Sequence, residues 1–574
     1  MAENTKCSFR MNLNLRATPE NTYDAIVIGS GISGGWAAKE LTEKGLKTLV
    51  LERGRMVEHV TDYPTANLDP WEMPHRGSVP FADRQAAPIQ SKVYNYHEGS
   101  KHFYVRDEDT PYNQVKPFDW IRGYHVGGRS ILWGKQTYRW SDLDFEANAK
   151  DGYGVDWPIR YAELAPWYSY VEKFAGISGS VENIPVLPDS EFLPPMEMNI
   201  LEKQVAKRIE EHYKGMRKMI IGRVAHLTVP HNGRGACQYR NRCERGCPFG
   251  AYFSSNSSTL PAAKATGNLT IRPFSVVHSI IFDEQKGRAT GVKIVDAETM
   301  QSYEFFAKVI FCNASTLGSA AILLNSKSNR FPNGLGNDSD QLGHNLMDHH
   351  YGVGAYGDTD DFQDTYFIGR RPNGTYIPRF RNVNDSEKRD YLRGFGYQGG
   401  ASRGQTSKDE GIGADFKQAL TEVGKWSFGM GAWGEHLPYY ENKATLDYDK
   451  KDKWGLPTLD IDCEFKENER KMRKDMANDA AEMLEAAGLK NVGTYDSSPA
   501  PGFCIHEMGT ARMGRDPKTS VLNGYNQIHA CKNVFVTDGA CMTSNGVVNP
   551  SLTYMALTAR AADWAVEELK RGNL

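Results

Sequence analysis

The sequence predicts an α/β protein with a doubly wound parallel sheet and a second, β-rich domain. Residues 23–54 contain an apolar run (AIVI), a glycine-rich turn, a stretch of helical composition ending at Gly45, and a second apolar run (KTLVLE). Strand, helix and strand in this order form a βαβ unit, whose two strands are parallel neighbours. A further apolar run at 308–314 precedes a helix-like stretch, TLGSAAILLNS. The chain therefore opens with a Rossmann-like, dinucleotide-binding fold.

The remaining chain changes in composition along its length. Proline, aspartate, tyrosine and histidine with weak periodicity predict long ordered loops at 60–120. Aromatic, charged and glycine-rich segments predict a β-rich substrate domain, followed by a helix at 465–487. The tail returns to a strand (NVFVTD) and a final helix. The first domain is expected at 20–345 and includes a cysteine loop at 234–256. The substrate domain is expected at 346–500, with parts of it from 60–120 and 180–230. Residues 501–574 are expected to return to the first domain.

Length and charge limit the class of protein. A chain of 574 residues suggests two to four units at about 150 residues per domain. Its 68 basic and 71 acidic residues leave a net charge of -3, which gives no argument for a nucleic-acid partner. No run of about 18 apolar residues is present to span a membrane, and the first twenty residues lack the apolar stretch of a secretory signal. We expect a soluble enzyme that carries no export signal of its own.

Gly29, Gly31 and Gly34 form a GxGxxG turn between the first strand and the first helix. The first glycine permits the tight turn, the second lets the backbone approach a pyrophosphate, and the third allows close packing of helix on strand. Glu52 ends the second strand, where an acidic side chain would accept hydrogen bonds from an adenosine ribose. FAD and NAD both fit this pattern, and the alternative is a turn required only for packing.

Two blocks near the carboxyl end carry the second signal: CIHEMGTARMG at 504–514 and NVFVTDGACMTSNGVVNPSLTYMALTARAADW at 533–564. By itself, His506 fits either a general base or a structural histidine. Together with the glycine turn, HVGGRSILWG at 125–134 and GLGNDSDQLGHNLMDHH at 334–350, these blocks resemble the glucose-methanol-choline oxidoreductase family over most of the chain. The resemblance implies FAD, with Asp538 and Gly539 near its pyrophosphate and ribitol.

The same resemblance assigns the remaining site residues. It places Gly127, Gly128 and Ser130 along the flavin, with packing as the alternative. Some pyranose oxidases attach FAD through a histidine before the tryptophan of this segment, but here Leu132 precedes Trp133, so we expect non-covalent FAD.

The resemblance also implies a catalytic pair, His506 and Asn549. Hydride leaves an alcohol carbon readily only when the hydroxyl proton is leaving, so a neutral imidazole acts as general base. An amide orients the hydroxyl and stabilises the developing alkoxide, and flavin accepts the hydride. For Asn549, the alternative is a turn residue before Pro550.

Cys237, Cys243 and Cys247 lie in RGACQYRNRCERGCPFGAYFSSNS at 234–256. Partial zinc site, redox disulfide and buried cysteines are the alternatives, but the spacing is not the C-x-x-C pair typical of zinc. Three thiolates suit a three-iron four-sulfur cluster, and the segment resembles that of FAD-dependent glucose dehydrogenase catalytic subunits. Four arginines would offset the charge of the cluster or form a solvated face that steers an acidic acceptor. They are Arg234, Arg240, Arg242 and Arg245.

These features predict an FAD-dependent dehydrogenase that oxidises a secondary hydroxyl of a sugar or glycoside, with C3 as the expected carbon. Electrons are expected to pass through the iron–sulfur cluster to a cytochrome c or quinone. A small accessory subunit would export the chain to the periplasm, and a cytoplasmic location is the alternative. Gluconate, glucose or sorbitol dehydrogenase, an oxygen-using pyranose oxidase and a non-redox FAD-containing lyase are the alternative functions. Candidate sugar-stacking or core aromatic residues are Tyr397, Trp426, Trp433, Tyr439 and Tyr440; Glu435 and His436 are expected near the flavin but not as catalytic residues.

Overall fold

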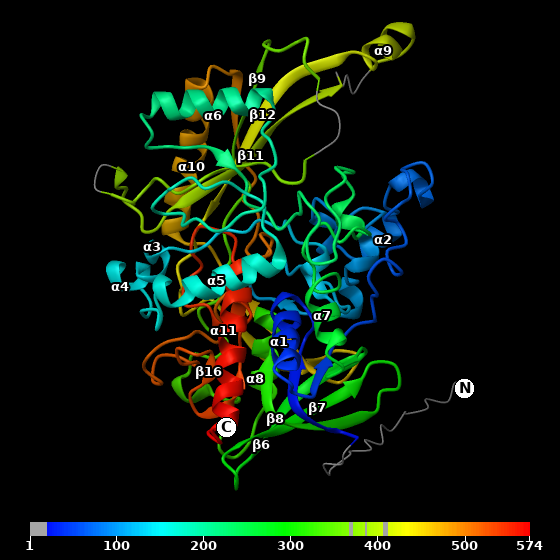
Figure 1. Ribbon diagram of the computed structural model, residues 1–574, viewed down its shortest axis with the longest axis vertical. Helices are drawn as coiled ribbons and strands as arrows, with labels where there is room; N and C mark the ends of the chain where they lie inside the picture. The colour runs from blue at the N-terminus through cyan, green and yellow to red at the C-terminus, as the bar shows by residue number, and fades with distance from the viewer. Residues whose placement is uncertain (1–19, 367–370, 385–386, 406–410) are drawn as a thin grey trace.

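A computed structural model of the chain describes residues 20–366, 371–384, 387–405 and 411–574. Two large sheets organise these residues, one at each end of the elongated molecule (Figure 1). The first nineteen residues, on which the expectation about an export signal falls, lie outside the described ranges. Within those ranges, no helix combines the length and the apolar character needed to cross a membrane.

The first sheet has eight strands in the order β16-β17-β8-β1-β2-β5, extended by the antiparallel pair β6 and β7 beside β8. Parallel pairing joins β1 to β2 and β8, β2 to β5, and β8 to β17. This confirms the predicted βαβ unit and the predicted strand around 308–314. The strands are β1 (Thr22–Ile28), β2 (Thr48–Leu51), β5 (Leu269–Arg272), β6 (Ser275–Asp283), β7 (Arg288–Asp296), β8 (Ser302–Cys312), β16 (Gln527–Ile528) and β17 (Cys531–Phe535).

Alternating side chains of β1 enter two hydrophobic cores, as the period of two in a strand requires. Ala25 and Val27 pack with residues of α1 (Ile32–Glu43) and α11 (Ser551–Lys570). Ile26 and Ile28 belong to the core that includes α8 (Thr316–Asn325). Helices therefore cover both faces of the sheet, which explains why the middle of the sheet is built from apolar segments such as Ala25–Ile28 of β1.

The second sheet has six antiparallel strands in the order β15-β9-β12-β11-β10-β4, with α6 and α10 on one face (Figure 1). The predicted helix at 465–487 is α10. Residues of opposite faces alternate on β11, where Tyr397 is buried under the helices and Gln398 points to the other side. The elements are β4 (Ile220–Ile221), β9 (Val353–Thr359), β10 (Thr375–Ile377), β11 (Phe395–Gln405), β12 (Val423–Gly434), β15 (Lys490–Asp496), α6 (Ile200–His212) and α10 (Glu467–Ala486).

A small third sheet is formed by the hairpin of β13 (Lys443–Lys451) and β14 (Pro457–Asp462) with β3 (Asn113–Gln114), and β13 packs against α8 of the first unit. The predicted divisions at 345 and 500 stay a prediction. Strand pairing shows that each large sheet draws on separate stretches of chain, because β17 joins the first sheet and β4 joins the second. The remaining helices are α2 (Phe81–Ala86), α3 (Asp142–Phe145), α4 (Ala147–Asp151), α5 (Tyr161–Ala175), α7 (Thr259–Ala265) and α9 (Ala414–Ala419).

Candidate active site

A cavity of about 610 Å³ runs from the glycine turn to the second sheet. Gly29 adopts a φ of 89°, and a Cβ there would lie 2.4 Å from the carbonyl oxygen of Asn313. A Cβ on Gly34 would lie 1.9 Å from the oxygen of Gly29, whereas one on Gly31 would meet nothing within 4 Å. Gly29 and Gly34 are therefore packing requirements, while Gly31 leaves open the space in front of the amino end of α1, where N–H groups favour phosphate.

Glu52 follows β2 and lies at the same end of the cavity. Its carboxylate accepts hydrogen bonds from the Ser30 N–H at 3.1 Å, the Ser30 hydroxyl at 2.5 Å and the Gly54 N–H at 3.0 Å. Burial raises the pKa of Glu52, and these donors oppose that shift because they stabilise the ionised form. The side chain is thus held in place beside the glycine turn.

Gly128, Ser130, Asp538 and Gly539 also line the cavity. Asp538 accepts hydrogen bonds from the Ala540 N–H at 2.9 Å and the Ser319 hydroxyl at 2.6 Å, and burial raises its pKa to about 6. Leu132 lines the cavity in the position where a covalent link would need a histidine.

For Gly127, the contacts favour the packing alternative. Gly127 does not line the cavity: its N–H donates to the Ser30 hydroxyl at 2.9 Å, and a Cβ would lie 1.7 Å from Oδ1 of Asn256. This glycine is required for close packing behind the cavity wall.

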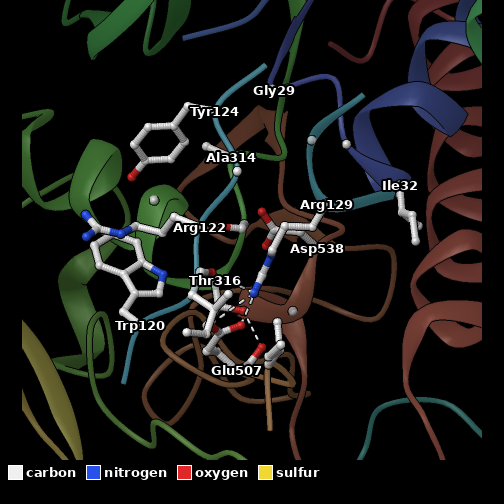
Figure 2. A pocket seen from close by; sticks show the side chains of 18 of the residues that line it. Gly29, Ile32, Trp120, Arg122, Tyr124, Arg129, Ala314, Thr316, Glu507 and Asp538 are labelled. Atoms are coloured by element: carbon white, nitrogen blue, oxygen red, sulfur yellow. Dashed lines mark hydrogen bonds and ion pairs between the residues drawn. The ribbon is translucent and has the colours of Figure 1, made fainter. Parts of the chain in front are cut away.

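The cavity offers hydrogen-bond donors that suit a polar cofactor. Nδ2 of Asn313 and the hydroxyl of Tyr554 are buried in its wall without a partner among the described residues. Figure 2 shows this region, where the guanidinium of Arg129 pairs with both carboxylate oxygens of Glu507 at 3.2 and 3.0 Å. The Thr316 hydroxyl donates to the main-chain oxygen of Glu507 at 2.5 Å. The size, open glycine and donors of the cavity fit a dinucleotide such as FAD.

His506 and Asn549 meet at the other end of the cavity, with Nε2 of the imidazole 3.4 Å from the amide nitrogen. The loop that carries His506 is held by Asp348, whose buried carboxylate accepts from the N–H groups of Gly502, Cys504 and His506 at 2.8, 3.1 and 2.9 Å. Burial raises the pKa of Asp348 to about 8, and these donors oppose that shift. Asp348 therefore fixes the backbone of the loop, and the fixed backbone positions the imidazole of His506.

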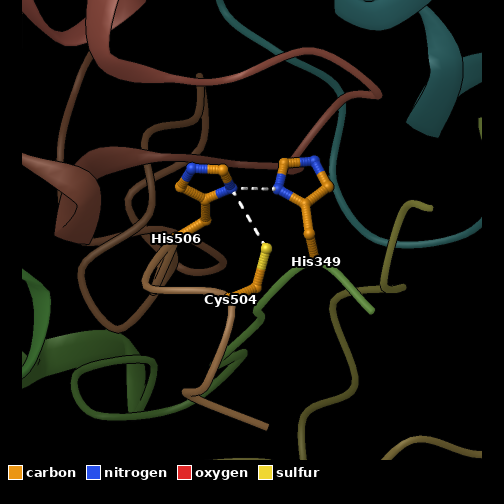
Figure 3. A group of neighbouring side chains, drawn as sticks. All are labelled: His349, Cys504 and His506. Carbon is orange, nitrogen blue, oxygen red and sulfur yellow. Dashed lines mark hydrogen bonds between the residues drawn. The ribbon is translucent and has the colours of Figure 1, made fainter. Parts of the chain in front are cut away.

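His349 determines which nitrogen of His506 carries the proton (Figure 3). Nε2 of His349 lies 2.8 Å from the carbonyl oxygen of Gly546, which can only accept, so this nitrogen is protonated. Nδ1 of the neutral His349 ring is then an acceptor, and it lies 3.0 Å from Nδ1 of His506. Nδ1 of His506 must be the donor, which leaves its Nε2 unprotonated and facing the cavity.

Burial keeps both rings in the neutral form. It lowers the pKa of His349 to about 4 and the pKa of His506 well below its usual value. Cys504 places its sulfur 3.5 Å from Nδ1 of His506, so these three side chains cluster closely enough to hold a metal ion. The Nδ1–Nδ1 hydrogen bond already accounts for their contact. The arrangement presents a neutral base to the cavity.

Gln398 determines the orientation of the Asn549 amide. Nε2 of Gln398, on β11, donates to Oδ1 of Asn549 at 2.8 Å. Because that oxygen is occupied, the NH₂ group of Asn549 points to Nε2 of His506. A strand of the second sheet thus contributes to the site, in which the hydrogen-bond donor and the base lie side by side.

Of the five candidate aromatic residues, Trp433 alone lines the cavity. Tyr397 and Trp426 lie in the core under α10, which accords with the core-packing alternative. Tyr440 stacks on His344 at a centroid distance of 4.0 Å, and Tyr439 is buried with its hydroxyl 3.1 Å from Glu469.

Glu435 and His436 are buried outside the cavity wall. Glu435 pairs with Arg379 at 3.1 Å, and burial raises its pKa to about 7. His436 accepts from the Asp348 N–H at 3.2 Å. Both residues therefore have structural partners behind the cavity wall, and their expected place near the flavin stays a prediction.

Cys237, Cys243 and Cys247 line one small cavity together with His226 and Tyr252. None of the three forms a disulfide, and Sγ of Cys243 lies 3.8 Å from Nε2 of His226. Burial raises the pKa of the Cys243 thiol to about 11. The donor set and its common cavity fit a thiolate-ligated centre.

Three of the four arginines tie the cysteine loop to residues 66–69. Arg240 donates to Asn67 at 2.8 Å, Arg242 pairs with Asp69, and Arg245 donates to the oxygen of Leu68 at 2.9 Å. Arg234 is buried and donates to the oxygen of Ala175. These contacts hold the loop in place. The four arginine side chains are hydrogen-bonded or ion-paired within the protein.

Sequence reasoning missed Arg129, Glu507, His349 and Gln398. The first three lie inside or beside quoted blocks, so the blocks pointed to the right segments without assigning roles. Gln398 lies in a glycine-rich strand, and no local signal distinguishes it.

A dinucleotide cavity that ends at a neutral imidazole and an amide defines a cofactor-dependent oxidoreductase. Residues 23–351 match the amino-terminal GMC oxidoreductase family model and residues 440–558 the carboxy-terminal one. The chain belongs to the GMC oxidoreductase family. It is an FAD-dependent oxidoreductase acting on CH–OH groups.

Individual relatives agree with this assignment. The chain is 29% identical to 2-methyl-1,2-propanediol dehydrogenase of Mycolicibacterium austroafricanum over 95% of this chain and 96% of the relative. It is 27% identical to the fructose dehydrogenase large subunit of Gluconobacter japonicus over 96% and 98%. Pyridoxine 4-oxidase from Mesorbium loti has the same fold, with a TM-score of 0.60 and 17% identity over 94% of this chain and 98% of that one.

Proposed function

We propose that the chain is a dehydrogenase that oxidises a secondary hydroxyl of a sugar or glycoside and yields a keto sugar, with C3 as the expected carbon. The observation that carries this proposal is the convergence of unprotonated Nε2 of His506 with the Asn549 amide in the cavity. Resemblance of the cysteine loop and the catalytic pair to glucoside 3-dehydrogenases favours C3.

Amide side chains beside the catalytic pair support a substrate with several hydroxyls. Asn373, Gln398 and Gln136 line the cavity, Gln398 donates to Asn549, and Nδ2 of Asn373 is buried without a partner among the described residues. A buried amide without a partner costs about 1–3 kcal/mol, so a ligand oxygen that accepts from it binds favourably. Trp433 adds an aromatic face to the same end. Amides and an aromatic face are the groups that recognise vicinal hydroxyls on a sugar ring.

The residues divide the chemistry as follows. Nε2 of His506 takes the hydroxyl proton, and Nδ1–H of the resulting imidazolium stays hydrogen-bonded to His349. The NH₂ group of Asn549 donates to the developing alkoxide, and Gln398 holds that amide in place. FAD, when bound, supplies the acceptor for the hydride, with Gly31, Glu52 and other cavity residues holding it.

Anaerobic mixing with sugars, glycosides and 1,2-diols tests the proposal. A glycoside or sugar is expected to bleach the flavin absorbance, and nuclear magnetic resonance of the product is expected to show a ketone at C3. His506→Ala should retain FAD but lose bleaching, since the base alone is removed. Absence of bleaching with every sugar, or bleaching by 1,2-diols alone, would contradict the proposed substrate class.

We further propose that Cys237, Cys243 and Cys247 ligate a three-iron four-sulfur cluster that carries electrons from the flavin. The common cavity and the all-sulfur donor set support this. Iron and sulfide analysis of anaerobically purified protein provides the test. Cys243→Ala should lose the iron, and Cys531→Ala, which removes a buried cysteine elsewhere, should keep it. Wild-type protein with FAD but without iron would refute the relay.

We propose a small accessory subunit as the partner, a cytochrome c or quinone as the acceptor, and co-export to the periplasm. Support comes from the relative whose name marks it as a large subunit. Co-expression with a small subunit encoded beside the chain, followed by affinity purification and fractionation, tests this. Recovery of the chain alone from the cytoplasm would contradict the proposal.

A further inference from the structure

The two cavities share a wall made of three neighbouring segments. The main-chain oxygen of Lys135 accepts from the Ala225 N–H at 2.9 Å, and the oxygen of Ala225 accepts from the Phe253 N–H at 2.9 Å. His226 pairs with Tyr252 in the same layer. Lys135 lines the large cavity, whereas His226 and Tyr252 line the cysteine cavity. This layer therefore separates the two cavities where these segments meet.

The Lys135 side chain lies within that wall. It is 3% exposed, and its ammonium lies 4.0 Å from the centre of the Tyr252 ring. Burial lowers the pKa of Lys135, and negative charge on Cys243, Glu244 and Cys247 opposes that shift. Lys39, a similarly buried lysine, has carboxylates at 3.1 and 2.7 Å, while Lys135 has no carboxylate within 4.0 Å in the described part of the chain.

A buried cation without a carboxylate is costly, because desolvation is not offset by a fixed counter-charge. A thiolate-ligated cluster on one side and a reduced flavin on the other would both supply negative charge. One electron added to the cluster, or two electrons and one proton added to flavin, increases that negative charge by one. A cation between them stabilises each reduced form.

We infer that Lys135 tunes electron transfer. Its buried positive charge raises the reduction potentials of both the flavin and the cluster. This inference rests on the proposed function, because it takes the cysteine cavity as the cluster site. The tyrosine ring contributes by holding the ammonium through a cation–π contact, which keeps the charge in the wall. Because one cation raises both potentials in the same direction, it changes the difference between them less than a cation beside one centre alone would.

Potentiometric titration of Lys135→Met and Lys135→Arg tests the inference. Flavin is followed by absorbance and the cluster by electron paramagnetic resonance. The methionine variant keeps the length of the side chain and removes the charge. It is expected to shift both equilibria at least tenfold toward the oxidised form, which is about 59 mV for a one-electron centre and about 30 mV for a two-electron centre. The arginine variant should stay near the wild-type potentials.

Unchanged potentials in folded, FAD-containing Lys135→Met would overturn the inference, as would a shift confined to one centre. Lys135→Gln provides a second neutral variant if the methionine protein does not fold. Wild-type protein that lacks iron and sulfide would instead refute the proposed relay and, with it, the shared role of Lys135. A lost cluster signal with intact iron content in the arginine variant would also count against the inference.

Discussion

Replacement of His349 tests the proton assignment in the active site. His349→Gln keeps a donor near the Nε2 position for the oxygen of Gly546, but removes the acceptor for Nδ1 of His506. His349→Asn keeps an oxygen near the Nδ1 position. The two variants therefore separate structural support of Gly546 from support of the base, because each preserves one of the two hydrogen bonds at 2.8 and 3.0 Å.

The expected magnitude follows from the charge formed in the reaction. When His506 takes the substrate proton, its Nδ1–H becomes a charged donor to His349, and such a hydrogen bond contributes about 1.5–3 kcal/mol. At about 1.4 kcal/mol per tenfold, its loss slows hydride transfer about 10- to 140-fold. The rate of flavin bleaching on anaerobic stopped-flow mixing measures this at saturating substrate. A folded, FAD-containing His349→Gln protein that bleaches at the wild-type rate would refute the assignment.

Other perturbations test the cofactor turn, the amide and the acid response. Gly31→Ala should fold but retain less FAD, because its Cβ enters the open space. Gly34→Ala should lower the unfolding temperature, because its Cβ meets a carbonyl oxygen at 1.9 Å. Equal unfolding temperatures of the two variants would contradict this. Gln398→Leu should slow flavin bleaching about tenfold with FAD content unchanged, since the Asn549 amide is freed. Acidification below pH 6.5 should remove the contribution that His349 makes to stability. The folded-state pKa of His349 is lowered to about 4, so its stabilising contribution is present at neutral pH, falls as pH drops from 6.5 to 4, and amounts to about 3 kcal/mol. Chemical unfolding measures the free energy of unfolding at pH 7 and at pH 4. The value at pH 7 minus the value at pH 4 should be larger for wild type than for His349→Gln.

Local patterns were sufficient for the βαβ unit and the cofactor end of the site. Gly29, Gly31, Gly34 and Glu52 act within one continuous segment, where strand, turn and helix follow directly from residue order. His506 and Asn549 were identifiable because the motifs around them resemble a family. The role of Gly127 could not be decided in this way, since a glycine required by a neighbouring side chain has the same sequence signature as one that faces a ligand.

Tertiary structure alone decided how the base is prepared for its chemistry. His349 and His506 are 157 positions apart, Gln398 and Asn549 are 151 apart, and Arg129 and Glu507 are 378 apart in the chain. The tautomer of a histidine depends on whether the group at its far nitrogen can donate or accept, and that group is here brought in from another part of the fold. Residue order specifies the chemical groups, but burial and the direction of each hydrogen bond are properties of the folded molecule.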